Sequence, residues 1–227
     1  MREIVLDTET TGLDPEAGHR VVEIGCLELI NRVPSGRSFQ AYLNPERDVP
    51  AGAYEVHGLS AEFLAKHPVF ADMCERFLEF IADSPLVIHN AAFDLKFVNA
   101  ELRRSGRETI VAARAVDTIE IARRKFPGSP ASLDALCRRF GIDNSMREKH
   151  GALLDAELLA EVYLELTGGR QASFGLAAAA GAAAAPSATV LETPAIRRAP
   201  RRHAPTAEEL AAHEALLTKI KAPIWRA

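Results

Sequence analysis

Composition changes abruptly after Gly168-Gly169, and this break decides how much of the chain can fold as one unit. Residues 171–188 hold ten alanines, and proline and arginine then become frequent up to Pro205. Such an alanine run has high helix propensity but no varied apolar face, so it cannot build a core. We therefore expect one folded domain over residues 1–170, followed by a flexible tail.

The tail is expected to contain three parts. Residues 171–176 follow the domain directly, residues 177–205 form an Ala/Pro-rich linker, and residues 206–227 form a terminal segment. The linker has the composition of a tether, so the segment beyond it should act separately from the domain.

The terminal segment predicts a short amphipathic helix. Thr206 and Glu209 form the T-x-x-E pattern of a capping box, and apolar residues then recur with helical spacing until the helix ends near Pro223. The helix could fold back on its own domain, but the tether favours docking on another protein. The side chains expected to make that contact are Leu210, Leu217, Ile220 and Trp225.

Residues 1–170 predict an α/β fold. Strand patterns lie at residues 3–8, 21–30, 38–43 and 86–89, and the first three could form a meander. Helical patterns lie at residues 70–82, 93–105, 118–126, 132–140 and 152–166. Strands first, and then strands alternating with helices, imply a mixed sheet flanked by helices.

Charge and cysteine content exclude several classes of protein. The chain has 27 basic and 31 acidic residues, so a broad basic surface for nucleic acid is not expected. The tail has seven basic and four acidic residues, which leaves 20 basic and 27 acidic residues in the body. Cys26, Cys74 and Cys137 are far apart, which argues against a disulfide framework or a zinc knuckle. No apolar run approaches the roughly 20 residues of a membrane span, so we expect a cytoplasmic protein.

Three acidic clusters suggest a purpose for the excess negative charge of the body. Asp7 and Glu9 are two residues apart at the end of the first strand, so they project from the same face. Asp94 follows the fourth strand in the first turn of a helix, where the helix dipole alone would favour an acid. On one continuous helix His150 and Asp155 would point about 140° apart, so His150 should precede the helix on a mobile segment.

Four carboxylates in one pocket would repel one another unless a cation compensates their charge. All-oxygen ligands favour Mg²⁺ or Mn²⁺ over zinc. Two such ions would clamp a phosphodiester, one activating the attacking water and the other stabilising the leaving 3′ oxygen. His150 is suited to take the proton from that water. The residues therefore predict phosphodiester hydrolysis.

The three clusters resemble the exonuclease motifs of the DEDDh family. They are D-T-E-T-T-G-L at 7–13, H-N-A-A-F-D at 89–94 and H-G-A-L-L-D at 150–155. That family has a ribonuclease H-like fold and removes nucleotides from 3′ ends with two metal ions. The resemblance implies that the general base is His150 and that the metal ligands are Asp7, Glu9, Asp94 and Asp155.

The same resemblance implies a set of contacts to the terminal nucleotide. These contacts would be made by Asp7, Glu9, Thr10, Thr11, Gly12, Leu13, His57, Phe93 and Asp155. Leu13 and Phe93 would offer apolar surface to the base. Turn formation by Thr11 and Gly12, and core packing by Phe93, are the alternative explanations of these residues.

Segments outside the motifs resemble, more narrowly, the proofreading (epsilon) subunits of bacterial DNA polymerase III. They lie at residues 126–128, 132–137, 160–169, 211–214 and 225–227. In that family the nuclease domain receives a frayed DNA 3′ end, and the terminal segment holds the catalytic (alpha) subunit. The resemblance thus implies a 3′–5′ exonuclease that releases nucleoside 5′-monophosphates and works in the bacterial cytoplasm with the replisome.

The sequence Q-A-S-F-G-L at 171–176 is similar to the short motif by which these subunits bind the sliding clamp. It offers two apolar side chains on a flexible segment, which suits a groove on a partner. The expected clamp contacts are Gln171, Ser173, Phe174 and Leu176.

Two other functions fit part of the sequence. An RNA-trimming exonuclease would use the same metal site, but it has no obvious need for a clamp motif and a docking helix. A structural bridge between polymerase and clamp would need the tail, but it would not require five intact catalytic positions.

Overall fold

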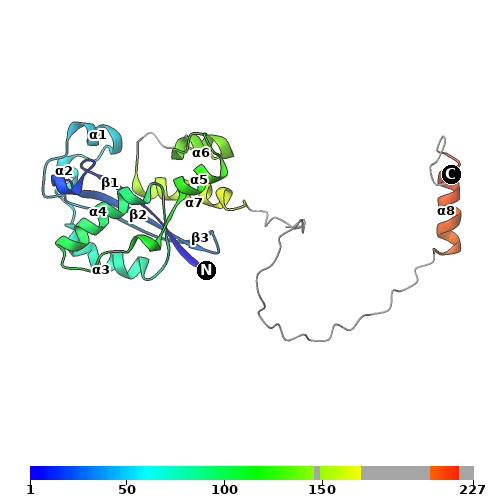
Figure 1. Cartoon of the computed structure of the whole chain (residues 1–227), viewed down its shortest axis with the longest axis horizontal. Helices are drawn as coiled ribbons and strands as arrows, with labels where there is room; N and C mark the ends of the chain where they lie inside the picture. The colour runs from blue at the N-terminus through cyan, green and yellow to red at the C-terminus, as the bar shows by residue number, and fades with distance from the viewer. Residues whose placement is uncertain (146–148, 170–204, 220–227) are drawn as a thin grey trace, which may run out of the picture. The chain divides into compact units, whose positions relative to one another are not determined.

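The structure is a computed structural model, and it describes residues 1–145, 149–169 and 205–219. The chain separates into two units, Met1–Leu176 and Ala177–Ala227 (Figure 1). The expected clamp contacts Gln171, Ser173, Phe174 and Leu176, and the expected polymerase contacts Ile220 and Trp225, lie outside the described residues.

The first unit is built on a five-stranded mixed sheet with the strand order β3-β2-β1-β4-β5. Its antiparallel half is the expected meander of β1 (Arg2–Thr10), β2 (Val21–Ile30) and β3 (Val33–Tyr42). The short strands β4 (Leu86–Ile88) and β5 (Ala115–Asp117) continue the sheet parallel to β1. The mixed sheet predicted from the sequence is confirmed.

Helices cover both faces of the sheet. The helical elements are η1 (Pro15–Ala17), α1 (Ala51–His57), α2 (Ala61–Leu64), α3 (Phe70–Ile81), α4 (Ala91–Arg104), η2 (Ala112–Arg114), α5 (Thr118–Lys125), α6 (Leu133–Phe140) and α7 (Ala152–Leu166). Ile4 and Leu6 of β1 pack in the core formed with α3 and α4, whereas Val5 packs in the core formed with α5, α6 and α7. By this alternation Asp7 and Glu9 lie on the α7 side of the sheet.

The five helices expected in the body are present at α3 to α7, with ends within two residues of those predicted. The third strand begins at Val33 rather than at residue 38. Its first half is exposed and contains Pro34 and Gly36, which are tolerated because β3 lies at the edge of the sheet. The elements not predicted from the sequence include α1, α2 and β5, which have at most seven residues each.

In the second unit the described helix is α8 (Ala207–Leu217), and it begins with the expected capping box of Thr206 and Glu209. It ends six residues before Pro223, so the helix is shorter than predicted. Of the expected docking residues, Leu210 is exposed and Leu217 is buried.

Two further expectations concern the chain as a whole. Cys26, Cys74 and Cys137 are all buried and none of them forms a disulfide, as the sequence predicts. Among the described residues no helix combines the length and the apolar character that crossing a membrane requires.

Candidate active site

The turn that follows β1 is fixed by its own side chains. The hydroxyl of Thr10 donates to the carbonyl of Gly12 (2.7 Å), and the hydroxyl of Thr11 accepts from the backbone N–H of Arg20 (3.0 Å). A Cβ on Gly12 would lie 2.4 Å from the ring of His19, so a larger residue there would require this ring to move. The turn therefore holds the end of the strand that carries Asp7 and Glu9.

Asp94 lies in the first turn of α4 and is only 3% exposed. The hydroxyl of Thr8 donates to its Oδ1 (2.7 Å), which joins the end of β1 to α4. The start of α4 is held in turn by Asp117, whose carboxylate accepts from the backbone N–H groups of Asn90 (3.3 Å) and Ala91 (3.0 Å).

Burial raises the pKa of Asp94 to about 7, although the hydrogen bond from Thr8 works in the opposite direction, and the charge of Asp117 raises it further. A carboxyl group that ionises only near neutral pH is costly to keep charged without a compensating cation. The environment of Asp94 therefore fits a site that binds a divalent metal ion.

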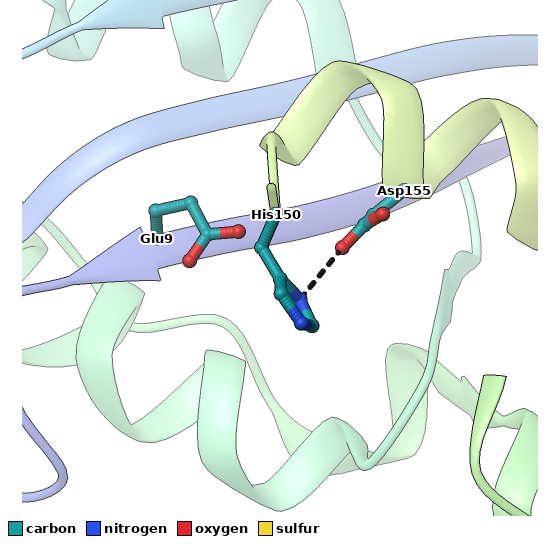
Figure 2. Close-up of side chains that lie close together, drawn as sticks. All are labelled: Glu9, His150 and Asp155. Atoms are coloured by element: carbon teal, nitrogen blue, oxygen red, sulfur yellow. Dashed lines mark ion pairs between the residues drawn. The ribbon is translucent and has the colours of Figure 1, made fainter. Parts of the chain in front are cut away.

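Glu9, His150 and Asp155 each offer a ligand atom, and these atoms lie within 4.8 Å of one another. Figure 2 shows the three side chains converging from β1 and from the start of α7. Nδ1 of His150 lies 3.2 Å from Oδ2 of Asp155. Because α7 begins at Ala152, His150 precedes the helix and Asp155 lies in its first turn, as the sequence predicts.

All five residues predicted to act in catalysis line one cavity of about 380 Å³. They are Asp7, Glu9, Asp94, His150 and Asp155. The sequence assigned no role to His89, Asn90, Ser132 or Asp134, which also line this cavity. These four residues could have been found because they lie in segments that resemble the family. His89 and Asn90 begin the second motif, and Ser132 and Asp134 lie in the segment 132–137.

A second cavity, of about 520 Å³, adjoins the first and shares Thr8, Glu9 and Phe93 with it. It is lined by seven of the nine residues predicted to contact the nucleotide, namely Glu9, Thr10, Thr11, Gly12, Leu13, His57 and Phe93. The other two, Asp7 and Asp155, line the catalytic cavity only. The sequence missed the apolar wall formed by Ala17, Pro50, Ala53 and Val56, because η1 and α1 were not predicted.

His57 and Phe93 line this second cavity in different ways. His57 is 5% exposed and its Nδ1 accepts from the backbone N–H of Leu59 (3.0 Å), so Nε2 carries the proton. Burial and, after it, the charge of Lys149 lower the pKa of His57, which keeps the ring neutral. Phe93 is half-buried: it packs against the core and also lines the cavity.

Comparison with known proteins gives a family. The family described as Exonuclease matches residues 4–163. The DNA polymerase III subunit epsilon of Rickettsia felis is 58% identical over 177 residues, which cover 77% of each chain. That of Escherichia coli K12 is 43% identical and covers all of this chain and 98% of the relative. The chain belongs to the DNA polymerase III epsilon family.

Membership of the epsilon family confirms the function predicted from the three motifs, a 3′–5′ exonuclease that proofreads DNA. The fold is confirmed as ribonuclease H-like by the nuclease domain of 3′hExo, a DEDDh family member solved with rAMP. That structure matches with a TM-score of 0.63 at 17% identity and covers 73% of this chain and 91% of its own. Members of this exonuclease family depend on divalent metal ions, which agrees with the donor set of the catalytic cavity.

Proposed function

We propose that the protein hydrolyses the last phosphodiester bond of a DNA 3′ end with two Mg²⁺ or Mn²⁺ ions held by Asp7, Glu9, Asp94 and Asp155. The observation that carries the proposal is that these four carboxylates and His150 line one cavity, and that a second cavity adjoins it and shares Thr8, Glu9 and Phe93 with it. Metal ions in such a site activate the attacking water and stabilise charge on the leaving 3′ oxygen.

In this proposal His150 removes the proton from the attacking water. Its ring lies beside the carboxylate of Asp155, within the cavity that holds the scissile bond. Its backbone N–H donates to the carbonyl of Val56 (3.1 Å), a residue that also lines the nucleoside cavity. The general base and the nucleotide pocket are thus joined by a main-chain hydrogen bond.

The second cavity receives the 3′-terminal nucleoside. Its walls are mostly apolar, and Leu13, which is 83% exposed, and Phe93 offer surface on which a base can stack. Thr10, Thr11 and Gly12 bring the backbone close to the sugar, and the buried ring of His57 forms part of the wall. A single unpaired nucleotide fits such a pocket, whereas a paired one must first be unstacked.

The tail binds the partner proteins. In this proposal residues 1–170 form the nuclease, residues 171–176 bind the sliding clamp and residues 206–227 bind the polymerase alpha subunit, all within the bacterial cytoplasm. Residues 177–205 act as a linker, which raises the effective concentration of the nuclease at the primer end without further contacts. This arrangement explains why the acidic nuclease domain needs no broad basic surface of its own.

The function is tested on 5′-labelled primer–template duplexes that differ only in the last base pair. The full chain in Mn²⁺ should remove a mismatched 3′ nucleotide about 10- to 100-fold faster than a matched one, because a mismatched end costs a few kcal/mol less to unpair. Single-turnover rates measure the difference. Equal rates on the two ends would contradict the preference, and faster turnover of an RNA strand of the same sequence would support the RNA-trimming alternative.

The tail is tested by deleting residues 206–227. Capture of the chain by immobilised polymerase alpha subunit should be lost, while kcat on single-stranded DNA stays within about twofold of the full chain, because the deletion leaves the first unit intact. A matched control is Phe174→Ala, which should weaken clamp binding and leave capture by the alpha subunit unchanged. Capture of the truncated chain would contradict the docking role of the terminal segment.

A further inference from the structure

A second buried glutamate lies beside the site and takes no part in the reaction described above. Glu23 of β2 is the direct cross-strand neighbour of Glu9 of β1, so the two side chains lie on the same face of the sheet. Only 2% of Glu23 is exposed. A buried carboxylate must be satisfied by specific partners, and those of Glu23 indicate what it does.

Both oxygens of Glu23 are engaged. Oε1 accepts from the side-chain amide of Gln40 on β3 (2.8 Å), and Oε2 accepts from the backbone N–H of Ala152, the first residue of α7 (3.2 Å). The N-cap of α7 is Gly151, which has no side chain to cap the helix. Glu23 of β2 therefore supplies the hydrogen-bond acceptor that the N-terminus of α7 lacks.

Gly25, two residues along β2 on the same face, sets how closely α7 approaches the sheet. A Cβ at this position would lie 2.3 Å from the backbone of Ala152 and Leu153. Gly25 is also the cross-strand neighbour of Asp7. The start of α7 thus rests directly on the pair of strands that carries the first carboxylates of the site.

The segment before α7 is held from two sides. On one side the N–H of His150 donates to Val56 of α1, and on the other side the N–H of Ala152 donates to Glu23 of β2. Asp155 follows in the first turn of the same helix. A shift of Ala152 would therefore move both His150 and Asp155 relative to Glu9.

We propose that Glu23 is a positioning residue, which holds the start of α7 and through it sets the places of His150 and Asp155 in the catalytic cavity. This inference rests on the roles given to His150 and Asp155 under the proposed function. Glu23 acts through the length of its side chain and not as a metal ligand, since it does not line the catalytic cavity and its oxygens are directed at Gln40 and Ala152.

Two conservative variants distinguish the length of the Glu23 side chain from its charge. Glu23→Asp keeps the charge but is one methylene too short to hold Ala152, so kcat should fall about 10- to 100-fold, because misplacement by about 1 Å costs this much. Glu23→Gln keeps the length, and its amide can bond Ala152 and, after rotation of the Gln40 amide, Gln40 as well. Its kcat should stay within about threefold of the wild type. KM should stay within about twofold in both variants, because no residue from the start of α7 lines the nucleoside cavity.

Glu28 provides the matched control. It is a buried glutamate on the same strand, 4% exposed, but it bonds Arg2 (2.6 Å) and Arg37 (3.1 Å) and pairs with Ile4, away from the site. Glu28→Asp should lower the melting temperature while leaving kcat unchanged. Full-chain variants are compared by steady-state kinetics on single-stranded DNA, thermal denaturation and calorimetry with Mn²⁺.

The outcomes are distinct. Lower kcat in Glu23→Asp with activity kept in Glu23→Gln supports the positioning role. Loss of activity and of Mn²⁺ affinity in Glu23→Gln would overturn the positioning role, because the negative charge of Glu23 would then be needed. An unchanged kcat in Glu23→Asp would overturn it as well. His150→Ala in the same series separates the two proposals: if it stays active, the proposed function fails, and if it is inactive while Glu23→Asp is fully active, only the role of Glu23 fails.

Discussion

Asp7→Asn is expected to lower kcat by about 10⁴-fold while the fold stays intact. The substitution keeps the size of the side chain but removes one anionic oxygen from the four carboxylates that line the catalytic cavity. Charge stabilisation by a metal ion is worth several kcal/mol, and each 1.36 kcal/mol corresponds to about a tenfold change in rate. The measurement is kcat on a single-stranded oligonucleotide, with Mn²⁺ affinity by calorimetry and stability by thermal denaturation.

Asp83→Asn is the matched control for this variant. Asp83 is exposed in the turn between α3 and β4, outside both cavities. Its kcat, Mn²⁺ affinity and stability should equal those of the wild type. The ligand role of Asp7 would be refuted by an Asp7→Asn protein whose kcat lies within about tenfold of the wild type, because loss of a metal ligand cannot be that mild.

The sequence predicted best those elements whose burial pattern is regular along the chain. All but the last residue of β2 are buried, so its nearly continuous apolar run gave the bounds Val21–Ile30 without error. Helix α7 is also mostly buried and was predicted over the range in which it occurs. In these elements the pattern in the chain and the packing of the fold carry the same information.

The elements that were missed are stabilised by contacts distant in sequence. β5 has three residues, all half-buried, and exists as a strand because it pairs with β4.

α1 was missed for a different reason. It has seven residues, and its ends are marked by Pro50 and by Gly58 in the left-handed conformation. Those signals were available, but seven residues show too little periodicity to decide between a helix and a loop.

The candidate site divides in a similar way. The spacing of the motifs identified the residues that line the catalytic cavity, and residues two apart on a strand had to share a face. The residues that hold the catalytic side chains in place could not be predicted from the spacing of the motifs. Their positions depend on the register of the strands and on long-range hydrogen bonds. Glu23 faces Glu9 only through the pairing of β1 with β2, and it reaches Ala152 across 129 residues of sequence.

His150→Ala is expected to lower kcat by about 10²- to 10⁴-fold, which is the range that a general base contributes. Since the four carboxylates remain, KM and the affinity for Mn²⁺ should change little. The truncation also leaves room beside Asp155 in a cavity of about 380 Å³. Free imidazole can enter this space and act as a base, so part of the lost activity should return when imidazole is added to the assay.

His67→Ala is the matched control, because His67 packs on Phe63 and Tyr42 and lines neither cavity. Its kcat should be unchanged and should not respond to imidazole. The competing role for His150 is that of a metal ligand, since its ring lies within 4.8 Å of the ligand atoms of Glu9 and Asp155. A fall in Mn²⁺ affinity that parallels the fall in kcat, without rescue by imidazole, would establish that role in place of the general base. Retained affinity with rescue is the combination that only a proton acceptor produces, because a ligand acts through the metal and a base acts on the water.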